Sequence, residues 1–61
     1  MVAYRCLFFD AAKHTRRVAS AELPDDPAAI EWAAGLLAAD PLSAAIEVWQ
    51  LARLICRHER A

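Results

Sequence analysis

The chain has 61 residues, 59% of them apolar, and a formal net charge of -1. This length allows one small domain covering residues 1–61, and the apolar content excludes an intrinsically disordered chain. The near-neutral charge gives the protein no overall attraction to nucleic acid or to anionic membranes.

Two cysteines and no recognisable secretory signal predict a protein of the reducing cytoplasm. No run of the sequence approaches the ~20 apolar residues of a membrane-spanning helix. A domain of this size buries only about 60% of the surface that its unfolded chain exposes, so its stability is marginal. Small domains often gain the missing stability from a disulfide, a metal ion or a partner.

The run Tyr4–Phe9 is the most apolar short run with strand character in the chain, and residues 2–9 together alternate too weakly for a half-exposed strand. Successive side chains of a strand point to opposite faces, and Arg5 is the only charged residue of this run. A strand that is apolar on both faces should be covered on both faces. We therefore expect this segment to form the central strand of a small sheet.

The segment Asp10–Thr15 is typical of a hairpin loop, because an aspartate at its start can accept hydrogen bonds from nearby backbone amides. It lacks the glycine of the tightest hairpins, which predicts a longer loop. The return strand is predicted at Arg16–Leu23. Its small apolar side chains Ala19 and Ala21 alternate with Ser20 and Glu22, which indicates an edge strand with one wet face.

The sequence Pro24-Asp25-Asp26-Pro27 marks the start of a helix. Asp26 is the predicted N-cap, and Pro27 occupies the first helical position, where its missing N–H costs nothing. The helix is predicted to end at Ala39, since the residue before Pro41 disfavours helix. Trp32 and Leu36 fall on the flank of the apolar stripe, which comprises Ile30, Ala33, Ala34 and Leu37.

Two more strands are predicted after the helix, at Ala44–Gln50 and Arg53–Glu59. The alternative is a ββα fold with a C-terminal helix, because this region is rich in helix formers. A helical stripe can be drawn through it at Ala45, Val48, Ala52 and Ile55. The β-branched and aromatic run Ile46-Glu47-Val48-Trp49 favours strands.

The chain also resembles a set of short bacterial proteins without an assigned function, mostly from alphaproteobacteria. The residues that carry the resemblance are Tyr4-Arg5-Cys6, Phe8, Asp10, Asp25-Asp26, Ala29-Ile30, Leu36-Leu37-Ala38, Pro41 and Ala45-Ile46-Glu47-Val48-Trp49. The resemblance implies the order strand, strand, helix, strand, strand, and it implies no activity. This chain departs from the pattern at both hairpin turns, where Ala12 and Leu51 replace a common glycine.

Two hairpins flanking one helix predict an α+β fold, ββαββ, with a four-stranded antiparallel sheet of order 2-1-3-4. The crossover through the helix should be right-handed, and the helix covers one face. The face under the helix is predicted to carry Cys6, Phe8, Ala19, Ala21, Ile46, Val48, Leu54 and Cys56. The other face is predicted to carry Leu7, Phe9, Trp49 and Ile55, surrounded by Arg5, Glu47, Arg53 and Arg57.

This second face predicts the function. Two aromatic and two aliphatic side chains form a larger apolar patch than a monomer usually exposes. We therefore expect a small interaction module that forms a homodimer, or binds an unknown protein partner, through Leu7, Phe9, Trp49 and Ile55. Trp32 could add a second contact point. The alternative is that strand curvature and long arginine stems cover the patch within one chain.

A second functional hypothesis concerns the loop from Lys13 to Arg17, where basic residues gather. Lys13, Arg16 and Arg17 could contact phosphate in a nucleic-acid accessory protein. Short basic clusters are more often solvated hairpin tips, and no aromatic residue interleaves with this one as single-strand binders require.

No catalytic, metal or cofactor site is predicted. Cys6 and Cys56 should lie two strands apart, roughly 10 Å, which is too far for a disulfide. Cys56 and His58 are the only closely spaced pair of potential zinc ligands, with His14 remote from them. Asp25 and Asp26 stand where a helix cap is needed. The serines, Ser20 and Ser43, have no adjacent base in the sequence.

Overall fold

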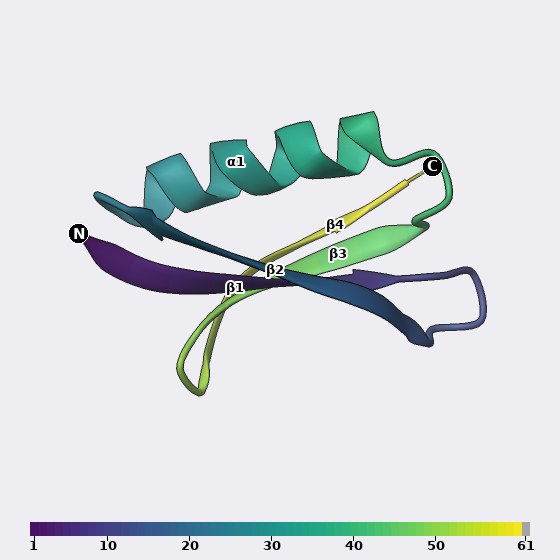
Figure 1. Ribbon diagram of the computed structural model, residues 1–61, viewed down its shortest axis with the longest axis horizontal. Helices are drawn as coiled ribbons and strands as arrows, with labels where there is room; N and C mark the ends of the chain where they lie inside the picture. Colours follow the sequence, from purple (N-terminus) through teal and green to yellow (C-terminus); the bar gives the residue numbers. More distant parts are fainter. Residues whose placement is uncertain (61) are drawn as a thin grey trace.

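The computed structural model describes residues 1–60 of the chain. Four strands and one helix follow one another in the order ββαββ. Their bounds are β1 Val2–Phe9, β2 Thr15–Leu23, α1 Asp26–Ala39, β3 Ala45–Gln50 and β4 Arg53–Glu59. Figure 1 shows α1 lying along one face of the sheet, while the other face carries no helix.

The sheet has the order β2-β1-β3-β4, and every neighbouring pair of strands is antiparallel. This confirms the predicted fold, with β1 in the interior of the sheet and β2 at its edge. The alternative of a C-terminal helix is wrong, because Arg53–Glu59 pairs with β3 along its length. The predicted strand bounds differ from the observed ones by one residue at the starts of β2 and β3.

The core lies between β1, β3 and α1. Tyr4, Cys6 and Phe8 point from β1 toward the helix and are almost fully buried. The rest of the buried apolar cluster comes from the helix and β3 and comprises Ala29, Ala33, Leu37, Ile46 and Val48. The alanines of α1 bring the helix close to the sheet, so a short chain achieves a closed core without many large side chains.

The helix begins one residue earlier than predicted, and its cap is a different aspartate. Asp25 is the N-cap, with extended backbone angles, and its Oδ1 accepts a hydrogen bond of 3.0 Å from the amide of Ala28. Asp26 is therefore the first helical residue, and its carboxylate is available for contacts to the sheet. The shift matters because Asp26 joins the helix to β1 and β4.

The buried stripe of α1 also differs from the prediction. It consists of Ala29, Ala33 and Leu37, whereas Ile30 is 38% exposed and Ala34 is exposed. A spacing pattern alone allowed either stripe, because alanine fits both a buried and a solvent-facing helix position. Trp32 and Leu36 pack half-buried against the core from the flank of the helix.

Arg60 closes the C-terminal end of the helix. Its guanidinium donates hydrogen bonds to the carbonyls of Leu37, Asp40 at 2.8 Å and Ser43 at 3.0 Å. The last carbonyls of a helix have no partner within it, and a cation there also complements the helix dipole. Arg60, which follows the last strand, thus donates hydrogen bonds to carbonyls at the end of α1 and in the turn that leads to β3.

Both hairpin turns contain a residue with positive φ that is not glycine. Asp10 Oδ1 accepts from the amides of Ala12 and His14 at 2.9 Å each, which confirms the expected aspartate-capped loop. Within it, Lys13 has φ 68°, and Leu51 has φ 54° in the two-residue loop between β3 and β4. This left-handed region normally selects glycine because it brings Cβ close to the backbone.

A β-bulge in β4 changes which side chains share a face. Val48 pairs with Cys56, but Trp49 pairs with Leu54, so Ile55 is an extra residue of β4. Paired residues share a face. Leu54 therefore belongs to the face opposite the helix and Ile55 packs against the core, the reverse of the prediction for both.

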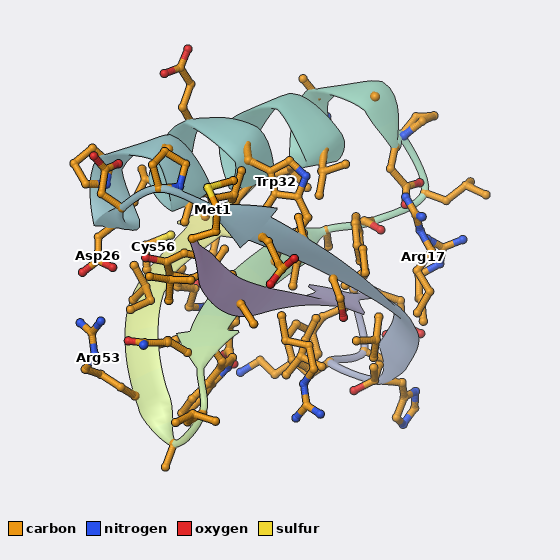
Figure 2. All side chains as sticks on the ribbon, turned by 60° about the vertical axis from the view of Figure 1, so that its left-hand side comes forward. Met1, Arg17, Asp26, Trp32, Arg53 and Cys56 are labelled. Carbon is orange, nitrogen blue, oxygen red and sulfur yellow. The ribbon has the colours of Figure 1, made fainter. Side chains whose placement is uncertain are left out.

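The bulge also corrects the placement of Arg53. This residue pairs with Gln50 and reaches the helix side, where its guanidinium contacts Asp26 at 3.2 Å (Figure 2). The prediction placed Arg53 on the helix-free side because it assumed uninterrupted alternation along β4. The extra residue Ile55 reverses the faces of the side chains that precede it, Arg53 and Leu54, relative to those that follow it.

Both cysteines are free, and β3 lies between the strands that carry them. Cys6 is fully buried, and burial raises the pKa of its thiol to about 11. Burial also raises the pKa of Cys56, which is only half-buried. Within residues 1–60, no helix has the length and apolar character needed to cross a membrane.

Candidate interaction surface

The sheet face that α1 leaves uncovered is called the helix-free face here. Strand pairing and alternation assign residues to it from all four strands. They are Ala3, Arg5, Leu7, Phe9, Val18, Ser20, Glu22, Glu47, Trp49, Leu54, Arg57 and Glu59. The structure thus brings together three of the predicted interface residues, Leu7, Phe9 and Trp49. It adds two aliphatic side chains: Leu54, which was predicted under the helix, and Val18, which was not among the predicted interface residues.

Those two additions are the most exposed apolar groups within the strands of this face. Val18 on the β2 edge is 51% exposed, and Leu54 on the β4 edge is 46% exposed. Leu7, Phe9 and Trp49 lie between them and are half-buried. Leu7 lies opposite Val18 and Trp49 lies opposite Leu54, so an apolar band crosses the sheet diagonally and passes from Leu7 to Trp49 between Arg5 and Glu47.

Part of the helix-free face is covered by a polar network. Arg57 contacts Glu47 and donates to Glu59 at 2.9 Å, and the Trp49 indole N–H donates to Glu47 at 3.0 Å. The Arg57 guanidinium also lies 5.9 Å from the centre of the Phe9 ring. One arginine stem therefore covers Phe9, as the alternative of intrachain coverage anticipated, while the opposite half of the face has no such cover.

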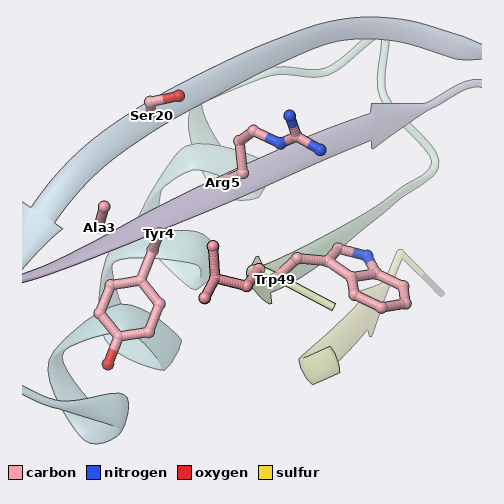
Figure 3. Close-up of a pocket in the computed structure, with 6 residues that line it drawn as sticks. Ala3, Tyr4, Arg5, Ser20 and Trp49 are labelled. Atoms are coloured by element: carbon pink, nitrogen blue, oxygen red, sulfur yellow. The ribbon is translucent and has the colours of Figure 1, made fainter. Parts of the chain in front are cut away.

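That opposite half contains a hollow of about 370 Å³. Its lining comes mainly from β1, β2 and the end of β3, and comprises Ala3, Tyr4, Arg5, Ser20, Trp49 and Leu51. Figure 3 shows Arg5 extending between Ser20 and Trp49, while the Tyr4 ring turns away from it. Small side chains at Ala3 and Ser20 leave the space open.

Arg5 differs from the other arginines in its lack of a partner. Its neighbours across the strands are Ser20 and Trp49, and within residues 1–60 its side chain makes no hydrogen bond or ion pair. An exposed guanidinium beside an indole ring and a hydroxyl can bind a carboxylate. The hollow therefore combines an apolar wall with one unsatisfied positive charge.

Leu51 forms the rim of the hollow and is 92% exposed. It combines a large apolar side chain, almost full exposure and a left-handed backbone. Each of these is unfavourable for an isolated chain. Such a residue is better accommodated where a binding partner covers it.

Two other predicted interface residues lie elsewhere. Ile55 packs against the core because of the bulge, and Trp32 packs half-buried against the core on the helix side. Figure 2 shows Trp32 projecting from α1, the element on the covered side of the sheet. Neither residue is on the helix-free face, so a single partner on that face would not reach them.

Two of the three basic residues predicted to contact phosphate form ion pairs within the chain. Phe8 pairs with Arg17 and Phe9 with Thr15, so Arg16 is the extra residue of a bulge in β2. Both arginines turn toward Asp40, with Arg16 at 3.1 Å and Arg17 at 3.5 Å. Arg17 also stacks 4.0 Å from the Phe8 ring centre.

Asp40 thus neutralises much of the loop's charge. It also accepts a hydrogen bond of 2.8 Å from the Ser43 hydroxyl and one of 3.2 Å from the amide of Leu42. The Ser43 bond and the nearby Arg16 and Arg17 guanidiniums lower the pKa of this carboxyl. Of the three predicted phosphate contacts, only Lys13 makes no such intrachain ion pair.

The groups that could perform chemistry are dispersed. Among residues 1–60, no three histidine, cysteine or acidic side chains gather in a way that could hold a metal ion. His58 lies on the helix side, opposite Ile46, and its Nε2 is buried without a hydrogen-bond partner. Ser43 is buried and bonded to Asp40 and Arg16, so its hydroxyl acts as a structural link.

Comparison of the chain with protein-family models, with curated proteins and with solved structures finds no match in any of the three.

Proposed function

We propose that this chain is a small protein-interaction module that self-associates through the helix-free face. The observation that carries the proposal is the apolar band from Val18 to Leu54, with Trp49 between them, on a face that no other element of the fold covers. Antiparallel sheets commonly have one solvated face, but that face is then largely polar. Here Leu7, Phe9 and Trp49 lie on its two central strands, beside Arg5 and Glu47.

The size of the domain gives association a thermodynamic reason. The fully buried core contains only a few large side chains, chiefly Phe8, Ile46 and Val48. Burying apolar surface contributes about 25 cal/mol per Å², and one aromatic side chain can bury roughly 150–250 Å². Covering Trp49 and its neighbours with a second copy therefore adds burial that the monomer cannot reach by itself.

Intrachain coverage accounts for only part of the face. Arg57 lies over Phe9, and its salt bridges hold it there. Among the residues that the structure describes, no comparable side chain covers Leu54 or Val18, which remain about half exposed. The unprotected part of the band is therefore where a second copy would be expected to bind.

The test is the molar mass of the chain in solution across a wide concentration range, measured by sedimentation. The wild type should form a dimer at micromolar concentrations. Leu54→Asp and Val18→Asp place a charge in the band without touching the buried core, so both should shift the equilibrium toward monomer by at least tenfold. Circular dichroism confirms that each variant remains folded.

Leu42→Asp is the matched control, because Leu42 is 72% exposed and lies in the turn after the helix. This variant should dimerise like the wild type. A wild-type chain that stays monomeric at several hundred micromolar would overturn the proposal. Equal loss of association in Leu42→Asp would also contradict it, because the effect would then not belong to the helix-free face.

A further inference from the structure

The helix-free face carries one positive and one negative side chain that have no partner within residues 1–60. They are Arg5 on β1 and Glu22 on β2, and both are exposed. We infer that a second copy of the chain docks on this face with Arg5 of each protomer paired to Glu22 of the other. This inference rests on the proposed self-association and specifies the contacts that orient it.

The positions of the two residues suit such an exchange. Arg5 pairs with Ser20 and Ala3 pairs with Glu22, so the two charges are offset by one strand and two residues on the same face. Diagonal neighbours of this kind are about 7–8 Å apart at their Cα atoms. The residues between them, Ala3 and Ser20, are small, which lets a second sheet approach closely.

The other charges of the helix-free face are already engaged, which singles out this pair. The five remaining guanidiniums have fixed partners: Arg16 and Arg17 bind Asp40, Arg53 binds Asp26, Arg57 binds Glu47 and Glu59, and Arg60 binds backbone carbonyls. The two other acidic residues of the helix-free face, Glu47 and Glu59, are both held by Arg57. Among the residues of the helix-free face that the structure describes, Arg5 and Glu22 are thus the charges left to complement a second copy.

A two-fold axis uses this pair twice. In a dimer of identical surfaces, each contact made by one protomer is repeated in reverse by the other. Two Arg5–Glu22 pairs would then flank the axis beside the hollow lined by Trp49 and Leu51. Covering the hollow removes water from the pairs, and lower local polarity strengthens the attraction between opposite charges. The ion pairs would fix the orientation while the apolar band supplies most of the buried area.

The experiment exchanges the charges between two variants. Arg5→Glu and Glu22→Arg each place like charges opposite one another in a homodimer, so each alone should dimerise at least tenfold more weakly than wild type. Mixed in equal amounts, the two variants should form a heterodimer of near wild-type affinity, because it contains one reversed pair and one original Arg5–Glu22 pair, and both are complementary. The double variant Arg5→Glu/Glu22→Arg should again form a homodimer.

Glu31→Arg is the control for the change in net charge, since Glu31 is exposed on the helix and its side chain forms no hydrogen bond or ion pair within residues 1–60. It should dimerise like the wild type. Circular dichroism of every variant establishes that the fold is kept, and Arg5→Gln with Glu22→Gln provides milder versions of the same change.

The outcomes separate this inference from the proposal beneath it. If Leu54→Asp abolishes dimers while Arg5→Glu and Glu22→Arg dimerise normally, the pairing is refuted and self-association stands. If the double variant recovers but the mixture does not, the two residues pair within one chain, which also refutes the inference. A wild-type chain that stays monomeric at all concentrations refutes both the pairing and the proposed self-association.

Discussion

The hydroxyl of Tyr4 donates a hydrogen bond of 2.7 Å to the carboxylate of Asp26, which joins the interior strand β1 to the first turn of α1. Arg53 from β4 reaches the same carboxylate at 3.2 Å. Three elements therefore meet at one aspartate, and the residue before it, Asp25, caps the helix. Of the two adjacent acids, Asp25 therefore caps the helix and Asp26 links the helix to β1 and β4.

This contact predicts the ionisation of Tyr4, the only tyrosine of the chain. Its hydrogen bond to the negative Asp26, together with burial, raises the pKa of the phenol above the ordinary tyrosine value. Ultraviolet absorbance should therefore show a raised titration midpoint in the folded chain, and Asp26→Asn should lower that midpoint. Titration at the ordinary value in the wild type would contradict the contact.

The same shift determines stability at high pH. A group whose folded pKa is raised stabilises the fold fully below its unfolded pKa, and the stabilisation is lost as pH rises through the folded value. The contribution of Tyr4 should therefore be complete at neutral pH and vanish in strong alkali. Urea unfolding of Tyr4→Phe should show a smaller loss of stability on going from neutral to alkaline pH than the wild type shows.

The lowered pKa of Asp40 predicts that the fold loses stability in acid. Its folded pKa is lowered, chiefly by the Ser43 hydroxyl and then by backbone and arginine contacts. A group of this kind contributes stability that is present above the ordinary carboxyl pKa, about 3.9, and lost as pH falls through the folded value. Asp40→Asn should therefore reduce the stability at pH 7 and flatten its decline below pH 4, with urea unfolding as the measurement.

Glu31→Gln is the control for Asp40, because Glu31 lies exposed on the helix. It should leave both the stability at pH 7 and the acid slope unchanged. If Asp40→Asn lost stability below pH 4 as steeply as the wild type, the contacts of Asp40 with Ser43, Arg16 and Arg17 would not contribute to the stability of the fold.

The sequence predicted the elements and their order because those follow from local signals. Pro27 and the acids before it mark the helix start, and the apolar run around Cys6 and Phe8 identifies the strand that belongs inside the sheet. These signals depend on each residue's own preferences and on a simple period. The fold class, the sheet order and the presence of a helix-free face therefore follow from the sequence alone.

The details of the face could not be predicted because they depend on register. A bulge is a one-residue offset between two strands, and nothing in the sequence of β4 distinguishes Ile55 from its neighbours as the extra residue. The same holds for Arg16 in β2. The offset in β4 placed Arg53 on the helix side and Leu54 on the helix-free face, which changed the apolar band.

We expect Leu51 to lower the stability of the monomer while it strengthens self-association. A left-handed backbone costs a residue with a Cβ roughly 1–2 kcal/mol, and glycine avoids most of this. Leu51→Gly should therefore leave monomer stability unchanged or raise it by about 1 kcal/mol. It should also weaken self-association, because it removes an exposed apolar side chain from the rim of the hollow.

Lys13→Gly is the matched variant, since Lys13 also has positive φ but lies in the other hairpin. It should change stability in the same direction without weakening the dimer. Thermal unfolding and sedimentation measure the two quantities separately. A clear loss of monomer stability in Leu51→Gly would show that the leucine side chain supports the fold.

The bulge of β4 predicts opposite consequences for two adjacent residues. Uninterrupted alternation would bury Leu54 and expose Ile55, whereas the observed register does the reverse. Ile55→Ala should therefore lower the free energy of unfolding by about 1–2 kcal/mol, below the usual cost for a fully buried isoleucine because this one is half-buried. Leu54→Ala should change monomer stability little and should weaken the dimer. Urea unfolding under conditions that keep the chain monomeric, followed by sedimentation, measures both effects. If Leu54→Ala destabilised the monomer more than Ile55→Ala, the two strands would pair without the bulge, and Leu54 would leave the helix-free face.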